Sequence, residues 1–101
     1  MDSKLTVIIV NYKSWNYLSK CLDSLIEQDS GTPNIVIVDN FSNDGKIQEF
    51  ESQYKSVKWI KLSYNSGFST ACNIGAKHAK SPWVLFLNPD AIVPKDCFKK
   101  L

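Results

Sequence analysis

The order of short apolar runs and amphipathic segments is the feature that most restricts the fold of this chain. Four mostly apolar runs alternate with segments whose apolar residues recur at helical spacing. The runs are Leu5–Val10, Ile35–Val38, Val57–Leu62 and Trp83–Leu87. Such strand–helix alternation indicates a parallel sheet with right-handed crossovers and helices on its faces. We therefore predict an α/β fold with a Rossmann-like parallel sheet.

The four runs differ in how deeply they are expected to be buried. Leu5–Val10, Ile35–Val38 and Trp83–Leu87 are almost entirely apolar, which is typical of parallel strands buried on both faces. The run Val57–Leu62 contains Lys58, and a second lysine follows at position 61. Charged side chains within a strand favour an exposed or edge position.

Three helices are expected between these strands. The first follows Ser14, a candidate cap, and is predicted by an apolar stripe at Leu18, Cys21, Leu22, Leu25 and Ile26. The second is short and is indicated by Ile47, Phe50 and Tyr54. In addition to these three, a helix after the fourth strand is expected to begin at Pro94 and to run toward Leu101.

The third helix is predicted over about Ser69–Ala79 and has a stripe of mostly small residues. The stripe consists of Phe68, Ala71, Cys72, Gly75, Ala76 and Ala79. Gly75 lowers the intrinsic stability of the helix by about 1 kcal/mol relative to alanine. A close approach of this helix to the sheet would compensate for that loss.

Length, charge and cysteine content exclude several classes of protein. A chain of 101 residues accommodates one domain. Twelve lysines, no arginine and ten acidic residues give a net charge of +2, too small to indicate nucleic-acid binding. Three widely spaced cysteines and one histidine argue against a zinc site and favour free thiols. No run approaches the ~20 apolar residues of a membrane span, and the N-terminus does not resemble a signal peptide.

Polar residues follow all four predicted strands. Ligands of open α/β sheets bind beyond the carboxyl ends of the strands, where these residues gather. They are Asn11, Tyr12, Asp39, Asn40, Tyr64, Asn65, Ser66, Gly67, Asn88 and Asp90. Each one alone is explained by a turn that closes a strand. Four polar strand ends at one edge favour a binding site instead, and a buried carboxylate at Asp39 would need partners.

The loops lack the signatures of several common enzymes. The turn after the first strand has no glycine, so the dinucleotide motif G-x-G-x-x-G is absent. Neither G-x-x-x-x-G-K-[ST] nor G-x-S-x-G occurs, which excludes a P-loop and a hydrolase elbow. His78 lies within the third predicted helix with no nucleophile at an obvious spacing, which indicates a surface or partly packed histidine.

Asn88-Pro89-Asp90 is the most specific local feature of the sequence. A carboxylate directly after a strand can hold a divalent cation against a diphosphate, because Mg²⁺ and Mn²⁺ use one or two carboxylates plus substrate phosphates. Pro89 stiffens the turn between the two polar side chains. An ordinary Asn-Pro-Asp turn is the alternative.

Together these motifs resemble the nucleotide-binding half of a family 2 inverting glycosyltransferase with the GT-A fold. The resemblance rests on four segments in the family's order: Val7–Ser14, Ile35–Gly45, Asn65–Gly75 and Val84–Asp90. The second is similar to V-D-N-x-S-x-D-G, the third to N-x-G-F-x-x-A-x-N-x-G, and the fourth occupies the position of the metal-binding D-x-D. Residues 1–101 would then form the N-terminal, donor-nucleotide-binding part of such a domain.

The resemblance implies a role for each matching residue. Asn11, Tyr12 and Asp39 would contact the base, while the side chains of Ser42 and Asp44 would hold the loop after Asp39. The remaining site residues would lie beside the nucleotide and its diphosphate. They are Asn65, Gly67 and Asn73 at the nucleotide, Asn88 near the ribose and Asp90 at a divalent metal, Mn²⁺ or Mg²⁺.

Two differences from the family pattern affect this interpretation. Asn88 replaces the first aspartate of D-x-D, which weakens the hold on a cation and leaves the metal requirement open. The family's general base lies in a later segment and is expected beyond Leu101, as is the acceptor half. The chain alone is therefore expected to bind the donor weakly and to catalyse little. The N-P-D form also resembles rhamnosyltransferase-like members, a hint about the donor sugar.

The implied function is transfer of a sugar from a nucleoside diphosphate sugar to an acceptor hydroxyl, in polysaccharide or surface-glycan synthesis. The acceptor would be a glycan or a lipid-linked molecule, and the location cytoplasmic, with peripheral membrane association of a longer parent left open. The alternative is a non-catalytic nucleotide-binding or interaction module. A receiver-like domain ranks last, because Asn11 and Tyr12 stand where it needs an acidic pair. An exposed sheet edge would favour self-association.

Overall fold

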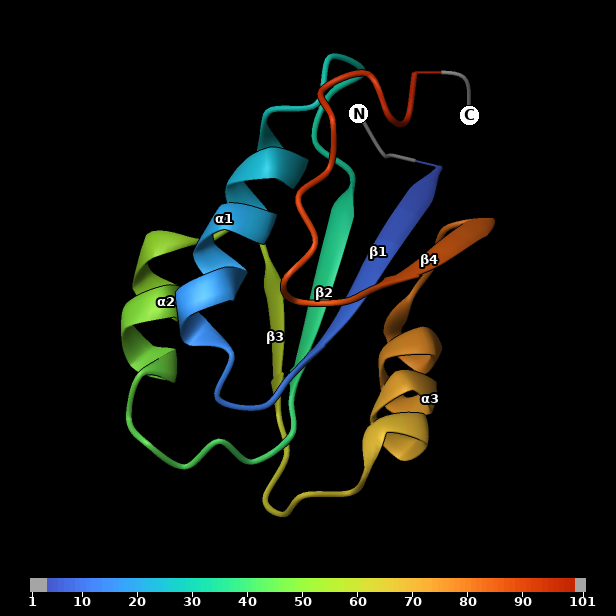
Figure 1. Cartoon of the computed structure of the whole chain (residues 1–101). Coiled ribbons are helices and arrows are strands. Elements are labelled where there is room, and N and C mark those ends of the chain that lie inside the picture. Colours follow the sequence, from blue (N-terminus) through green and yellow to red (C-terminus); the bar gives the residue numbers. More distant parts are fainter. Residues whose placement is uncertain (1–3, 100–101) are drawn as a thin grey trace.

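The computed structural model describes residues 4–99, which form a four-stranded parallel sheet with helices on both faces (Figure 1). In chain order the elements are β1 (Leu5–Asn11), α1 (Trp15–Ile26), β2 (Asn34–Asp39), α2 (Ile47–Gln53), β3 (Lys58–Lys61), α3 (Phe68–His78) and β4 (Trp83–Leu87). The strands lie in the order β3-β2-β1-β4. The predicted alternation and the α/β class are confirmed.

The register places the carboxyl ends of the two central strands side by side. Asn11, the last residue of β1, pairs with Asp39, the last residue of β2. On the other side of β1, Ile9 pairs with Leu87 at the end of β4. The loops that leave β1 and β2 therefore begin next to each other, at the edge where ligands of such sheets bind.

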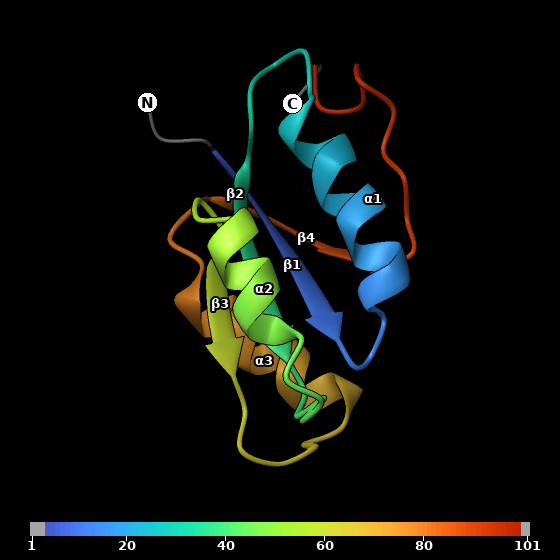
Figure 2. The same ribbon diagram turned by 90° about the vertical axis from the view of Figure 1, so that its left-hand side faces the viewer.

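The larger core lies between the sheet and the helices α1 and α2 (Figure 2). Leu18, Leu22 and Leu25 of α1 are fully buried, as the apolar stripe predicted. Phe50 of α2 connects this core to β3, because its ring centroid lies 4.8 Å from that of Trp15 and 6.3 Å from that of Trp59. These aromatic contacts position α2 although none of its residues is fully buried.

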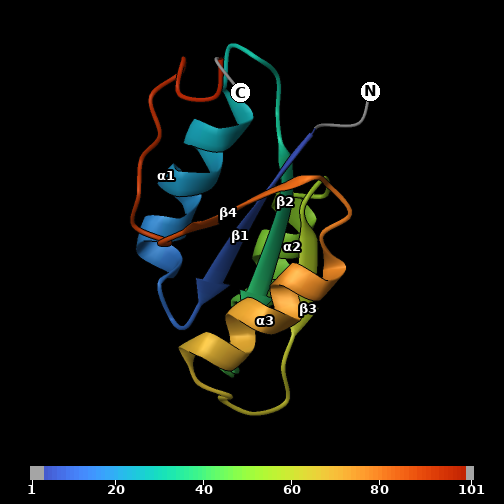
Figure 3. The ribbon, with the colours of Figure 1, turned by 90° about the vertical axis from the view of Figure 1, so that its right-hand side faces the viewer.

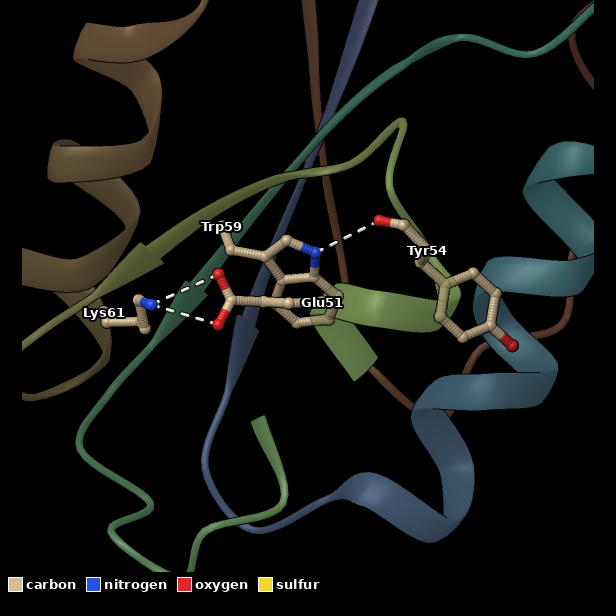
Figure 4. A network of polar contacts seen from close by, with 4 residues as sticks. All are labelled: Glu51, Tyr54, Trp59 and Lys61. Carbon is tan, nitrogen blue, oxygen red and sulfur yellow. Dashed lines mark hydrogen bonds and ion pairs between the residues drawn. The ribbon is translucent and has the colours of Figure 1, made fainter. Parts of the chain in front are cut away.

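Polar contacts between α2 and β3 add to this packing (Figure 4). The Lys61 ammonium lies 3.0 Å from a carboxylate oxygen of Glu51, and the Trp59 indole donates to the Tyr54 carbonyl at 3.3 Å. The Lys61 and Glu51 side chains are both partly exposed, so this ion pair contributes at most about 1 kcal/mol. The position of β3 at the sheet edge agrees with its predicted exposure.

A smaller core lies under α3, on the opposite face of the sheet (Figure 3). It contains Ile8, Val38 and Ala71, all buried. A Cβ atom at Gly75 would lie 2.6 Å from Ile8 Cγ2 and 3.1 Å from Val38 Cγ2. Real Cβ atoms do not approach that closely, so the absent side chain allows α3 to lie against the sheet. The predicted compensation for Gly75 is confirmed.

The prediction of a fourth buried strand was wrong. Trp83, Val84 and Phe86 of β4 are 63%, 40% and 49% exposed. The reason is position: β4 lies at one edge of the sheet formed by the described residues, while α3 packs over β1 and β2. Leu85 and Leu87, which alternate with Val84 and Phe86, are partly buried against the larger core.

Other corrections concern the ends of helices. Ile26 and Phe68 are exposed because they are the last residue of α1 and the first of α3. The Ser14 side chain makes no capping bond, and its hydroxyl donates to the Tyr12 carbonyl instead. The chain after Pro94 forms turns up to residue 99 rather than a helix, and residues 100 and 101 lie outside the described part. None of the helices described is long and apolar enough to cross a bilayer.

Candidate functional site

A buried hydrogen-bond network joins the carboxyl ends of β1 and β2. The Asn11 amide donates to Asp39 Oδ1 at 2.9 Å, and the Ser42 hydroxyl donates to the same oxygen at 2.7 Å. Asp39 Oδ2 accepts the backbone N–H of Ser42 at 3.1 Å. All three residues are buried. Three donors therefore satisfy a carboxylate that would be costly to bury alone, and they fix its orientation.

The loops after the two strands are also bound to each other. The backbone N–H of Lys13 donates to Ser42 Oγ at 2.8 Å, which joins the two loops. Within the first loop, the backbone N–H of Ser14 donates to Asn11 Oδ1 at 3.2 Å. Lys13, Phe41 and Asn43 have φ values of 56°, 63° and 51°. Left-handed backbone at non-glycine residues carries strain of order 1 kcal/mol or more each, and such strain clusters at functional sites.

A second link reaches these loops from the start of α1. The indole N–H of Trp15 donates to the Asp44 carboxylate, at 2.9 Å to Oδ2 and 3.2 Å to Oδ1. Asp44 Oδ1 also accepts the backbone N–H of Lys46 at 3.3 Å. The expectation that Ser42 and Asp44 hold this loop is confirmed. Trp15 was not predicted, although a buried indole beside a polar loop usually has a partner for its N–H.

Asn40 connects the same edge to the loop before α3. Its side-chain oxygen accepts the backbone N–H of Ser66 at 2.8 Å and the Ser66 hydroxyl at 3.0 Å. Its amide donates to the Gly67 carbonyl at 3.2 Å, and its backbone N–H donates to the Asn11 carbonyl at 2.8 Å. Asn40 was noted at a strand end but not chosen as a site residue. Its position directly after Asp39 was the one signal in the sequence, and its burial is evident only in the folded structure.

The loop before α3 contains two of the predicted site residues. Asn65 Oδ1 accepts the backbone N–H of Gly67 at 3.0 Å, which closes a short turn. Gly67 occupies the N-cap position of α3 with φ 82°, a conformation that other residues adopt only with strain. The structure thus brings Asn65 and Gly67 to the same edge as Asn11 and Asp39, through Asn40.

Tyr12 and Asn73, the other residues predicted to contact the nucleotide, are exposed. The Tyr12 side chain is about half exposed, and Lys13 Nζ lies 5.4 Å from the centroid of its ring. Asn73 is exposed on α3. The exposed Tyr12 ring directly follows Asn11, so it can contact a ligand without disturbing the buried network, whereas no described contact joins Asn73 to that network.

The segment Asn88–Asp90 lies against α1 rather than in this network. The Cys21 thiol donates to the Asn88 carbonyl at 3.8 Å, and farther along the chain Val93 N–H donates to the Ser24 hydroxyl at 3.0 Å. Burial raises the pKa of the Cys21 thiol to about 11, and the negative charge of Asp90 contributes to the rise. The Asn88 and Asp90 side chains are exposed.

The described side chains can hold a metal ion only if a bound ligand supplies additional oxygen atoms to its coordination shell. No group of three or more His, Cys, Asp or Glu side chains within residues 4–99 is arranged to hold an ion. Asp90 offers a single exposed carboxylate. Mg²⁺ commonly binds one or two carboxylates and completes its shell with substrate phosphates and water. Asp90 is therefore suited to a cation shared with a diphosphate, not to an all-protein site.

The three cysteines are free, as predicted. Cys21 is buried, Cys72 is half-buried and Cys97 is exposed. Burial raises the pKa of the Cys72 thiol. Neither it nor Cys21 has the lowered pKa of a reactive thiolate.

Comparison with known proteins shows the family. The model of "Glycosyl transferase family 2" matches residues 6–101. Glycosyltransferase GlyA of Streptococcus pneumoniae is 36% identical over 104 residues, which cover 100% of this chain and 15% of that protein. A teichoic acid poly(glycerol phosphate) polymerase of Staphylococcus epidermidis is 33% identical over 92 residues, which cover 87% of this chain and 13% of the polymerase.

Solved structures give the same result for the fold. The crystal structure of S. aureus TarS 1–349 in complex with UDP-GlcNAc matches with a TM-score of 0.84 and 30% identity, over 98% of this chain and 29% of that one. A second TarS structure, in complex with UDP, matches with a TM-score of 0.82 and 31% identity, over 98% of this chain and 30% of that one. The described sheet is of the GT-A type. The chain belongs to glycosyl transferase family 2, and it spans less than a third of the length of each of these two relatives and of the TarS 1–349 chain.

Proposed function

We propose that this chain carries the donor-nucleotide site of a glycosyltransferase that moves a sugar from a nucleoside diphosphate sugar to an acceptor hydroxyl in surface-glycan synthesis. The observation that carries the proposal is the buried Asp39 carboxylate, held by Asn11 and Ser42 at the edge where β1 and β2 end. That edge is the ligand-binding edge of parallel sheets. Residues 1–101 would form the donor half of the domain.

The relatives support the chemical class of this proposal. TarS was crystallised with UDP and with UDP-GlcNAc, and the S. epidermidis relative is named as a poly(glycerol phosphate) polymerase. A Bacillus spizizenii poly(ribitol-phosphate) beta-glucosyltransferase is 32% identical over 93 residues, which cover 86% of this chain and 15% of that enzyme. These names point to nucleotide sugars and to surface polymers.

We assign the base to the β1/β2 side of the edge. Asp39 Oδ2 accepts one hydrogen bond from the described residues and retains acceptor capacity for a donor on a base. Asn11 orients Asp39, and the exposed Tyr12 ring supplies an apolar surface beside it. Asn65, Gly67 and Asn73 would contact the rest of the nucleotide from the α3 side.

We assign the phosphates to the β4 side. Asn88 would lie near the ribose, and Asp90 would hold Mn²⁺ or Mg²⁺ together with the diphosphate. The cation would neutralise the charge of the leaving diphosphate. The general base and the acceptor site are proposed to lie in residues beyond Leu101, and the Asn-Pro-Asp form supports a hexosyl- or rhamnosyl-type donor. Free thiols and a nucleotide-sugar donor fit a cytoplasmic location.

A calorimetric titration with UDP, GDP and dTDP, with and without Mn²⁺, tests this assignment. We expect one nucleotide to bind, more tightly with Mn²⁺, and Asp90→Ala to remove the metal effect. Tyr12→Ala should weaken binding about tenfold through loss of the ring contact, an aromatic stacking effect. Tyr17→Ala is the matched control, because Tyr17 is an exposed tyrosine of α1 outside the site.

The outcomes separate the site from the fold. Asp39→Ala should also abolish binding, but it removes a buried partner of Asn11 and Ser42, so its circular dichroism spectrum must show a folded chain. Tyr12→Ala carries the test if that variant unfolds, since Tyr12 is exposed. Absence of binding to the folded wild-type chain would contradict the proposal. Equal weakening by Tyr12→Ala and Tyr17→Ala would contradict the placement of the base.

A non-catalytic module of the same fold would use the same site. Measured transfer of sugar from the donor distinguishes an enzyme from such a module.

We also propose self-association of this chain through β4. Trp83, Val84 and Phe86 are exposed on a strand at the sheet edge, where pairing with a second copy would cover them. Sedimentation velocity would show a dimer that dissociates on dilution.

A further inference from the structure

A cavity of about 550 Å³ lies at the opposite end of the strands from the candidate donor site. Its floor is formed on the α3 face of the sheet by residues near the amino ends of the strands, including Thr6, Asn34 and Lys58. One wall comes from the end of α3 and the following loop, through His78 and Lys80. Figure 3 looks onto this face, where α3 ends close to the amino ends of β2 and β3.

The cavity is separate from the donor site. Thr6 lies near the start of β1, while Asn11 is its last residue. Five residues of extended strand span about 17 Å. None of the site residues assigned above lines the cavity.

The lining of the cavity is basic. Lys58, His78 and Lys80 line it, and none of its described lining residues is acidic. Among residues 4–99 the described ion pair joins Lys61 to Glu51, and no carboxylate of these residues forms an ion pair with Lys58 or Lys80. His78 Nδ1 lies 2.9 Å from the Ile74 carbonyl, which can only accept, so the Nδ1 proton is held there. With that proton on Nδ1, Nε2 of the neutral ring accepts rather than donates, so it suits a hydroxyl of a ligand.

Hydroxyl and amide groups surround these cations. Thr6 Oγ1 and Ser81 Oγ lie 2.7 Å apart, and the Asn34 amide donates to Ser81 Oγ at 3.1 Å. Thr32 and Ser56 add two more hydroxyls at the rim. The volume of the cavity falls in the range of small-molecule binding sites. An inorganic phosphate ion alone would fill only part of it.

We propose that this cavity binds a small phosphomonoester that carries hydroxyl groups. The two lysines would hold the phosphate, because both line this cavity and neither forms an ion pair with a carboxylate of residues 4–99. The hydroxyls of Thr32 and Ser56, together with His78 Nε2, would bind the hydroxyls of the ester. The proposal does not depend on the donor site, because the two sites share no residue.

The test is a titration of the ¹⁵N-labelled chain, followed by two-dimensional NMR, with sodium phosphate and with glycerol 1-phosphate at constant ionic strength. We expect saturable shifts at the amides of Lys58, Lys80 and Ser81, with at least about threefold tighter binding of the ester. Shifts at Asn11 and Asp39 should stay small. Shifts confined to the carboxyl ends of β1 and β2, or shifts that never saturate, would overturn the proposal. Equal affinity for phosphate and for glycerol 1-phosphate would also overturn it.

A pair of double variants distinguishes a formed site from diffuse positive charge. Lys58→Gln with Lys80→Gln should weaken glycerol 1-phosphate binding about tenfold, because two charges leave the ligand's surroundings. Lys55→Gln with Lys77→Gln changes the net charge equally and removes exposed lysines within three positions of the first pair, yet neither lines the cavity. This control should change affinity less than about twofold. Equal weakening in both double variants would overturn the proposal.

Discussion

The two sides of the sheet's carboxyl edge are built differently. At the ends of β1 and β2, Asn11, Asp39 and Ser42 are buried and bound to one another, and three neighbouring residues have left-handed backbone. Beyond β4, the side chains of Asn88 and Asp90 are exposed. The first region is held by the fold, whereas the second depends on its ligand for further contacts.

This difference teaches how a donor site can be divided. A base must be recognised by a fixed arrangement of donors and acceptors, because each misplaced polar group costs affinity. A diphosphate with its cation brings strong charges of its own and needs fewer fixed partners. The β1/β2 region therefore resembles the rigid half of a site, and the β4 region the half that a ligand completes.

The largest expected effect is the contrast between two aspartates. Asp39→Asn should lower the free energy of unfolding by about 2–4 kcal/mol, because the amide then opposes the donors of Asn11 and Ser42. Asp90→Asn should change it by less than about 0.5 kcal/mol, since Asp90 is exposed. Urea unfolding followed by circular dichroism measures both. Similar losses in the two variants would show that the regions do not differ as described.

Gly75→Ala should act on the packing that supports the rigid region. Its Cβ would meet Ile8 and Val38, which face α3 from β1 and β2. Overpacking of this kind costs about 1–3 kcal/mol, and the gain in helix propensity offsets about 1 kcal/mol of it. We expect a net loss of up to about 2 kcal/mol by urea unfolding. Thr70→Ala, an exposed change on the same helix, is the control; a stabilising Gly75→Ala would contradict the close approach.

Alkaline pH should weaken the fold through Cys21 and Tyr54. Burial raises the pKa of Cys21 to about 11, and burial together with Asp23 raises that of Tyr54 to about 12. Because both folded-state pKa values exceed the ordinary values of 9.0 for a cysteine and 10.0 for a tyrosine, the unfolded chain loses these protons first, and stability falls as pH rises above about 9. Urea unfolding at increasing pH should show a loss of about 2–3 kcal/mol by pH 10.5.

A pH titration of the Cys21 thiol tests whether the segment Asn88–Asp90 lies beside α1. Asp90→Asn removes a negative charge that helps to raise the pKa of Cys21, so the thiolate absorbance near 240 nm should appear at lower pH in this variant. Asp29→Asn removes another exposed acidic residue close to α1 and should leave that titration in place. An unchanged Cys21 titration in Asp90→Asn would contradict the placement of Asp90 beside α1.

The smallest effect on stability is expected at the exposed edge. Phe86→Lys should change the free energy of unfolding by less than about 0.5 kcal/mol, because Phe86 is 49% exposed. It should nevertheless reduce self-association, since a lysine on an edge strand opposes pairing with another chain. Sedimentation velocity compares it with Lys4→Gln, a charge change just before β1. Unchanged association in Phe86→Lys would contradict a dimer formed through β4.

Sequence periodicity was sufficient for the element order and for most of the first core, because β-branched runs and a regular helical stripe leave few alternatives. It failed at β4, whose composition predicts burial but whose place at the sheet edge leaves Phe86 exposed. Strand order is a property of the whole fold and cannot be read from the strand itself.

The hydrogen-bond network at the ends of β1 and β2 was predicted in the same uneven way. Asp39 and Asn11 could be found because they close two strands, and Ser42 and Asp44 because they belong to a recognisable loop pattern. The roles of Asn40 and Trp15 depend on loops that meet only after folding, at Ser66 and Asp44. No local spacing predicts such contacts.

Mapping nucleotide binding by NMR tests the central claim most directly. The ¹⁵N-labelled chain would be titrated with UDP, GDP and dTDP in the presence of Mg²⁺. We expect saturable shifts for one nucleotide at the backbone amides of residues 11–13, 39–42 and 65–67, with additional shifts at residues 88–90 when the diphosphate is present and not with the nucleoside alone. Shifts of a folded chain that avoid the ends of β1 and β2 would contradict the account.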